Sequence, residues 1–183
     1  MSLSSALIAA HAAAGAAGLL LAGPVLFAPK PGPRKLASAP RDGAPNRRKA
    51  GRLHVLLGRA YALATAVLCL TAFGLVAYDP VRLAGLAVLG VLTAGWVGAG
   101  VWLARRRPRL GGPGRWRIWH LNCMGSSVIS FVTAFAVQAT DGHLVAWLAP
   151  TLIGSPLIAW RTRREAQALP GAGKPTGAAE ATA

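Results

Sequence analysis

Five long runs of apolar residues, separated by shorter stretches rich in arginine, proline or glycine, account for most of the sequence. A helix needs about 20 mostly apolar residues to cross roughly 30 Å of hydrocarbon. The runs are continuous and lack the two-residue alternation that is typical of membrane-spanning strands. The pattern therefore predicts an all-α, polytopic transmembrane helix bundle within residues 1–160, with five spans at about residues 4–28, 53–77, 81–103, 118–139 and 143–160.

The stretches between the runs predict irregular structure. Residues Pro29–Arg52 are rich in proline, glycine and arginine. Residues Arg105–Arg117 contain Pro108 and the sequence Gly111-Gly112-Pro113-Gly114, which prevents a continuous helix. After the fifth run large apolar residues become scarce, so residues 161–183 are expected to form a disordered tail.

The composition favours a membrane protein over two other classes. Hydrophobic residue types make up 54% of the 183 residues, yet the formal net charge is +15. A soluble domain scatters its charges, whereas these charges are gathered between apolar runs. Cys69 and Cys123 are too few for a secreted disulfide scaffold. Because they lie at different depths of their runs, we expect both to stay reduced and unpaired.

The basic residues predict how the bundle is oriented. All of the 20 lysines and arginines except Arg59 and Arg82 lie between the first two runs, between the third and fourth, or after the fifth. Cytoplasmic loops carry such an excess, so the N-terminus is expected outside and the C-terminus, with its tail, in the cytoplasm. The preference for arginine over lysine favours a bacterial source with a GC-rich genome, and hence the bacterial inner membrane.

The first run could instead be a cleaved signal peptide. Such a peptide places a basic segment before an apolar core of about 7–15 residues. Residues Met1–Ser5 contain no lysine or arginine, and the basic residues follow this run. We therefore expect an uncleaved anchor.

Two kinds of partner could account for the positive charge. A nucleic-acid interface is not expected, because no recognition motif accompanies the charge, which lies where membrane insertion alone would place it. Contact with the lipid bilayer and with anionic inner-leaflet lipid explains the same distribution.

Small and aromatic residues indicate how the helices pack. Glycines recur in the first and third runs, where they let helix backbones approach closely, within the bundle or against a second copy or partner membrane helices. The six tryptophans mostly lie near the ends of the runs, as in an interfacial aromatic belt.

Ionisable side chains inside the runs are the candidate functional residues, because they are costly in a bilayer. His11 and His143 belong to the outer half of the predicted bundle, whereas His54, Arg59 and His120 belong to the inner half.

Two polar stripes accompany the inner histidines. Helical spacing places Tyr61 and Thr65 on the same face as His54, and Ser127 on the same face as His120. These stripes could form a ligand site, or they could simply join helices by hydrogen bonds. We expect His54, Arg59, Tyr61 and His120 to converge. Arg59 would favour an anionic group over a bare metal ion, so no metal site is expected.

Two motifs carry a resemblance to a known family. They are His54-x-x-x-Gly58-Arg59-x-Tyr61 and Trp119-His120-x-x-x-Met124-x-x-Ser127. In these motifs the sequence resembles a family of small bacterial multi-pass membrane proteins of unknown function, and the similarity extends from Ala6 to about Ile158. The resemblance implies a polytopic bundle and candidate residues, but no established reaction.

Three functions remain open from the sequence. The first is a membrane protein of unassigned activity with a polar histidine and arginine site at the inner side. The second is a redox protein, because histidines on different helices are the usual axial ligands of b-type haem. The third is a structural or accessory membrane subunit. A hydrolase is not expected, since the sequence has neither an H-E-x-x-H motif nor a serine nucleophile elbow.

Overall fold

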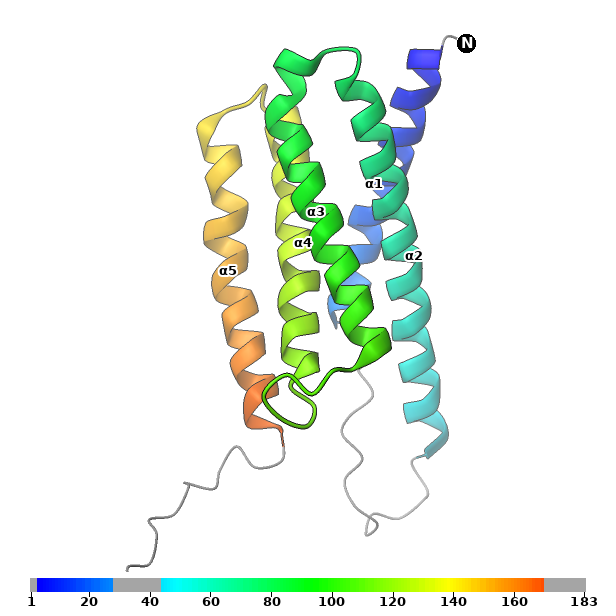
Figure 1. The fold of residues 1–183 in the computed structure, drawn as a ribbon, viewed down its shortest axis with the longest axis vertical. Helices are drawn as coiled ribbons and strands as arrows, with labels where there is room; N and C mark the ends of the chain where they lie inside the picture. The colour runs from blue at the N-terminus through cyan, green and yellow to red at the C-terminus, as the bar shows by residue number, and fades with distance from the viewer. Residues whose placement is uncertain (1–2, 28–43, 170–183) are drawn as a thin grey trace, which may run out of the picture.

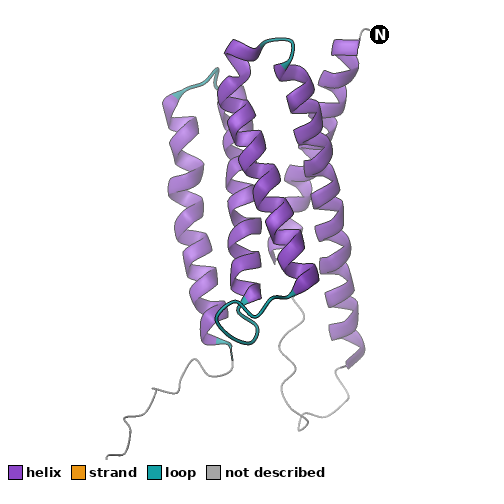
Figure 2. Ribbon diagram, in the orientation of Figure 1, coloured by secondary structure: helices purple, strands orange, loops and turns teal. Residues whose placement is uncertain are grey.

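A computed structural model describes residues 3–27 and 44–169, and the described residues contain five helices and no strand (Figure 2). Each helix is long and apolar enough to cross a membrane. The all-α class and the five-helix count expected from the sequence are therefore confirmed. The helices are α1 (Leu3–Phe27), α2 (Ala44–Val76), α3 (Pro80–Arg106), α4 (Trp116–Ala139) and α5 (Leu144–Gln167).

Helix α2 begins earlier than the apolar pattern predicted. It starts at Ala44 instead of near residue 53, so the last part of the expected irregular loop is helical. A proline in the first turn does not interrupt a helix, and the alanine, arginine and lysine residues that follow favour one. Hydropathy detects only the part of a helix that faces lipid. The rest of the expected loop lies outside the described residues.

Helix α5 likewise continues beyond the predicted span. It ends at Gln167, so residues 161–167 are helical and do not belong to a disordered tail. The Arg117 Nε atom lies 2.7 Å from Glu165 Oε1, and this ion pair joins the last turns of α5 to the start of α4. The remainder of the predicted tail, from residue 170, lies outside the described residues.

The connections between helices match their sequences. Asp79 caps α3, because its Oδ1 atom accepts a hydrogen bond from the Arg82 backbone N–H at 3.2 Å. The predicted break between α3 and α4 is confirmed, and the backbone there turns through positive φ angles at Gly111, Gly112 and Gly114. Glycine adopts these angles without the steric cost that a Cβ atom adds.

The first four helices pack around one another. Contacts join α1 to α2, α2 to α3 and α3 to α4, and a shorter contact joins α1 to α4. Helix α5 packs along α4 on the outside of this group (Figure 1). Successive helices run in opposite directions, so α2 and α4 are parallel to each other.

The two ends of the bundle differ in charge. One end, called here the basic end, carries the described arginines of the α3–α4 connection and of the last turns of α5, together with Arg52. The opposite end carries the short connections at residues 77–79 and 140–143, with Asp79, Arg82 and Asp141. This separation is the one that the charge distribution in the sequence predicted.

The surface of the bundle is largely apolar. Large hydrophobic side chains are exposed on all five helices, for example Leu20 at 76% and Leu152 at 71% of their maximal area. A water-soluble monomer rarely exposes continuous apolar surface on this scale. The chain is therefore consistent with an integral membrane protein whose outer surface contacts the lipid bilayer. The core inside the bundle is small and is built around Ala22, Val25, Tyr61, Val97 and Met124.

Exposed tryptophans gather toward the basic end. Trp102, Trp119 and Trp160 are each about half exposed and lie on α3, α4 and α5 within a few turns of the arginines. Amphipathic indole rings favour the membrane–water boundary. Their level is consistent with a boundary that leaves the arginine-rich connection in water.

Candidate functional site

Tyr61 links the two polar stripes. Its side chain is 1% exposed, and its hydroxyl lies 3.1 Å from Ser127 Oγ, which is fully buried. Ser127 donates its own proton to the Met124 carbonyl at 2.7 Å, so the Tyr61 hydroxyl is the donor to Ser127. The stripes on α2 and α4 therefore face each other, and at this level they form an interhelical hydrogen bond.

His54 and His120 occupy equivalent positions on α2 and α4, closer to the basic end than the hydrogen bond between Tyr61 and Ser127. Each lies seven residues before its stripe partner, Tyr61 on α2 and Ser127 on α4. Seven residues are close to two helical turns, so each histidine shares the face of its partner about 10 Å closer to the basic end. Because α2 and α4 are parallel, the register places both histidines at one level. The Nδ1 atom of His54 is shielded from solvent.

His120 is oriented by α3. Its Nδ1 atom lies 2.8 Å from the Gly100 carbonyl oxygen, which can only accept, so Nδ1 carries the proton. In the neutral ring the Nε2 atom is then left with its lone pair. The close approach depends on Gly100, because a Cβ there would lie 2.6 Å from Met124 Sδ.

Arg59 does not join the predicted cluster. It is exposed, whereas Tyr61, two residues along the same helix, is buried. Two residues correspond to about 200° around a helix, so the two side chains leave α2 on nearly opposite sides. The expected convergence of Arg59 with Tyr61 is therefore not seen. A side chain in this position can extend along the helix toward the basic end.

The two histidines predicted for the outer half have different environments. His143 is exposed and precedes α5, where its Nδ1 atom accepts a hydrogen bond from the Val145 backbone N–H at 3.3 Å. His11 is half-buried on α1, and its Nδ1 atom lies 3.1 Å from Thr71 Oγ1 on α2. At this end α1 and α5 lie on opposite sides of the bundle (Figure 1), so these histidines do not form a pair.

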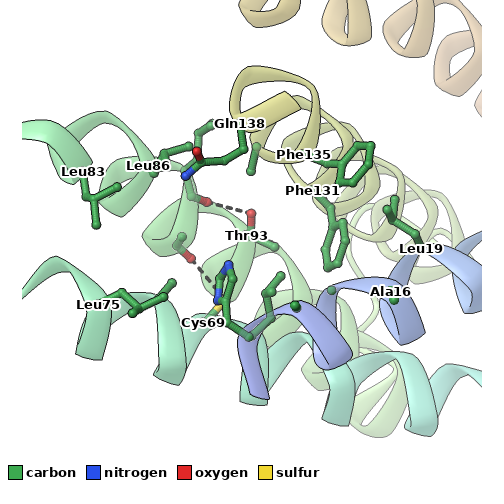
Figure 3. A pocket seen from close by; sticks show the side chains of 18 of the residues that line it. Ala16, Leu19, Cys69, Leu75, Leu83, Leu86, Thr93, Phe131, Phe135 and Gln138 are labelled. Atoms are coloured by element: carbon green, nitrogen blue, oxygen red, sulfur yellow. Dashed lines mark hydrogen bonds between the residues drawn. The ribbon is translucent and has the colours of Figure 1, made fainter. Parts of the chain in front are cut away.

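A cavity of about 740 Å³ lies between α1, α2, α3 and α4 in the half of the bundle away from the basic end. Most of its lining is apolar, and its polar members are His11, Cys69, Thr93 and Gln138 (Figure 3). We call this space the interhelical cavity. It is the feature that the sequence did not reveal.

The interhelical cavity has a floor and a side opening. Phe131 forms part of the lining and packs so tightly on α1 that a Cβ at Gly18 would lie 2.7 Å from its ring. Ile8 and Leu20 of α1 and Phe135 of α4 also line the cavity and are more than half exposed. The cavity therefore opens between α1 and α4 onto the apolar surface of the bundle.

Only three-dimensional packing could have revealed this site. Its apolar lining is indistinguishable in the sequence from ordinary membrane-facing leucine and alanine. The sequence did single out one lining residue, His11, as a candidate of the outer half. Gln138, an amide near the end of a span, and Thr93, the hydroxyl in the third span, were signals that it left unused.

The cysteines and acidic residues offer no metal centre within residues 3–27 and 44–169. Cys69 and Cys123 are free and buried, as expected. In this part of the chain no three side chains among histidine, cysteine, aspartate and glutamate group closely enough to hold a metal ion.

Comparison with protein-family models, curated proteins and solved structures finds no match to this sequence. The site must therefore be interpreted from its own geometry.

Proposed function

We propose that this chain is a multi-pass membrane protein that binds a small lipophilic molecule in the interhelical cavity. The observation that carries this proposal is the cavity itself. Its volume of about 740 Å³ lies within the roughly 300–1,000 Å³ of known small-molecule sites. A mostly apolar wall with a few polar groups is also typical of such sites.

Packing considerations favour an occupant. Protein interiors are packed about as densely as organic crystals, and large voids are destabilising. At the level of the cavity α1 and α4 are separated, whereas at Phe131 and Gly18 these two helices pack tightly against each other. The exposed rim residues Ile8, Leu20 and Phe135 would let a lipophilic molecule enter sideways from the bilayer.

Filling the cavity with a large side chain tests whether it binds a lipophilic molecule. Ala16 lines the cavity on α1, and its neighbour Ala17 is exposed and does not line it. Ala16→Phe should remove a bound molecule, whereas the matched variant Ala17→Phe should retain it. Protein purified in a mild detergent would be extracted with organic solvent, and co-purified lipophilic molecules would be quantified per chain by mass spectrometry. Equal retention by both variants, or none by the unaltered protein, would refute the proposal.

The two histidines nearest the basic end, His54 and His120, support a second candidate ligand, a b-type haem. The parallel register of His54 and His120, together with the hydrogen bond from His120 Nδ1 to the Gly100 carbonyl, is the specific observation in its favour. Haem-ligating histidines are commonly oriented by a hydrogen bond from the other ring nitrogen. His54 and His120 would hold the iron, and the haem would supply one-electron transfer.

An absorption spectrum of gently purified protein tests this candidate. A Soret band that is lost in both His54→Ala and His120→Ala, but kept in His143→Ala, would support it. His143 is a suitable control because it is exposed and caps α5. A colourless protein without iron would refute it, and would leave the lipophilic-ligand proposal unaffected.

The proposal also includes the orientation, the family and the location that the sequence predicted for this five-helix protein. The proposed orientation has the basic end in the cytoplasm, where its arginines would meet anionic inner-leaflet lipid. Membership of the bacterial family of unknown function and location in the inner membrane remain parts of this proposal. The accessory-subunit interpretation would use the exposed apolar faces of the helices to bind other membrane helices or a second copy.

A further inference from the structure

Two of the four polar side chains that line the interhelical cavity, Thr93 and Cys69, direct their protons at the backbone of α3. Thr93 donates its hydroxyl proton to the Leu89 carbonyl at 2.6 Å. The Cys69 thiol points to the Gly90 carbonyl at 3.6 Å, and Figure 3 shows both contacts directed at the backbone of α3. These side chains therefore present acceptor atoms, not donors, to the cavity.

The hydrogen bonds around Thr71 favour one tautomer of His11. The Thr71 hydroxyl has a single proton, and its oxygen lies 2.9 Å from the Val67 carbonyl and 3.0 Å from the Leu68 carbonyl, as donor to both. With its proton directed at these carbonyls, Thr71 Oγ1 accepts a hydrogen bond from His11, whose Nδ1 lies 3.1 Å away. This arrangement favours the neutral imidazole with its proton on Nδ1 and a lone pair on Nε2.

We place the ring edge of His11 that carries Nε2 toward the cavity. His11 belongs to the lining, whereas Thr71, its Nδ1 partner, does not. The edge of the ring that carries Nε2 is thus the one directed away from Thr71. Gln138 lies at the exposed end of the lining and is the remaining polar side chain there.

We infer that the cavity selects lipophilic molecules with a hydroxyl head group, which donates a hydrogen bond to His11 Nε2. This inference rests on the proposed function and adds the chemical class of the ligand. A ketone or ether of the same shape would meet acceptors at His11, Thr93 and Cys69, and the donor in the lining, the Gln138 amide, lies at its exposed end. Burying a polar group without a partner is unfavourable.

Cys69 supplies a direct measure of occupancy, because it lines the cavity whereas Cys123 does not. The protein in lipid nanodiscs would be treated with N-ethylmaleimide, and mass spectrometry would follow alkylation of each cysteine separately. The probes are 4-nonylphenol and its methyl ether, 4-nonylanisole. The phenol should protect Cys69 at about fivefold lower concentration than the ether, the factor that one hydrogen bond of about 1 kcal/mol provides. Alkylation of Cys123 is the internal reference.

The variants separate the role of His11 from general packing. His11→Phe keeps a ring but removes the acceptor, so the two probes should become equal. Thr71→Val should weaken the preference, because without the Thr71 hydroxyl the proton of His11 is no longer held on Nδ1. Thr133→Val is the matched control at a buried threonine that does not line the cavity, and it should retain the preference. Equal protection by both probes in the unaltered protein would overturn the hydroxyl preference while leaving cavity binding intact. Protection by neither probe would refute the binding proposal as well.

A ligand-free measurement keeps the inference falsifiable even if a variant fails to fold. Nitrogen-15 spectra of histidine-labelled protein distinguish a protonated from an unprotonated ring nitrogen. The signals of the other three histidines are identified by their loss in His54→Ala, His120→Ala and His143→Ala, which leaves those of His11. The expected result at neutral pH is a protonated Nδ1 and an unprotonated Nε2. A proton on Nε2 would overturn the inference.

Discussion

At the scale of single residues, the hydrogen bond between Tyr61 and Ser127 fixes the relation of α2 to α4. These two helices lie diagonally across the four-helix group and are joined by side chains. Their stripes were predictable from helical spacing, because residues three, four and seven apart share a face. The exposure of Arg59 follows from the same spacing, since it lies about 200° around the helix from Tyr61.

Tyr61→Phe tests this contact. It should lower the free energy of unfolding by about 0.5–1 kcal/mol, because it removes one buried hydrogen bond and leaves the ring in place. Denaturation in detergent with increasing sodium dodecyl sulfate would measure the change. Tyr78→Phe, at an exposed position between α2 and α3, should have no effect. An equal loss in the two variants would show that the hydroxyl of Tyr61 contributes nothing specific.

At the scale of helices, α5 depends on two reciprocal glycine contacts with α4. A Cβ at Gly125 of α4 would lie 2.7 Å from Ile158 Cδ1, and a Cβ at Gly154 of α5 would lie 2.5 Å from Ile129 Cγ1. The two pairs are separated by four residues on each helix, in opposite directions, as antiparallel packing requires. Each isoleucine thus fills the space above a glycine of the other helix.

Gly154→Ala should therefore destabilise the α4–α5 contact by about 1–3 kcal/mol, the usual cost of overpacking. The second substitution Ile129→Ala, which removes the clashing atoms, should recover part of the loss. The same denaturation measurement applies, and Gly98→Ala is the control because a Cβ at Gly98 would meet no neighbouring atom within 4 Å. If Gly154→Ala were as stable as Gly98→Ala, close packing at Gly154 would not hold α5 in place.

At the scale of the whole molecule, the separation of charge between the two ends predicts the orientation in the membrane. The described arginines at the basic end outnumber the single Arg82 at the opposite end, so the basic end should remain in the cytoplasm. An alkaline phosphatase reporter, which is active only outside the cytoplasm, should be inactive when fused after Arg164 and active when fused after Asp141. The reverse pattern would invert the topology.

The sequence by itself determined the class, the number of helices and the breaks between them. Each depends on local chemistry: apolar runs long enough for a bilayer, glycine and proline in the α3–α4 connection, and arginines that do not cross hydrocarbon. Helix ends were less well determined, because the polar turns at the start of α2 and the end of α5 leave no hydropathy signal.

Tertiary structure alone decided which polar residues meet and where space remains. Tyr61 forms a hydrogen bond with Ser127, whereas Arg59 leaves α2 on nearly the opposite side. His11 forms a hydrogen bond with Thr71 of α2 and lies apart from His143, which precedes α5. The interhelical cavity arises because α1 packs against α4 at Gly18 and Phe131 but is separated from it in the half of the bundle away from the basic end. The angle between two helices depends on side chains from both, so no single apolar run contains that information.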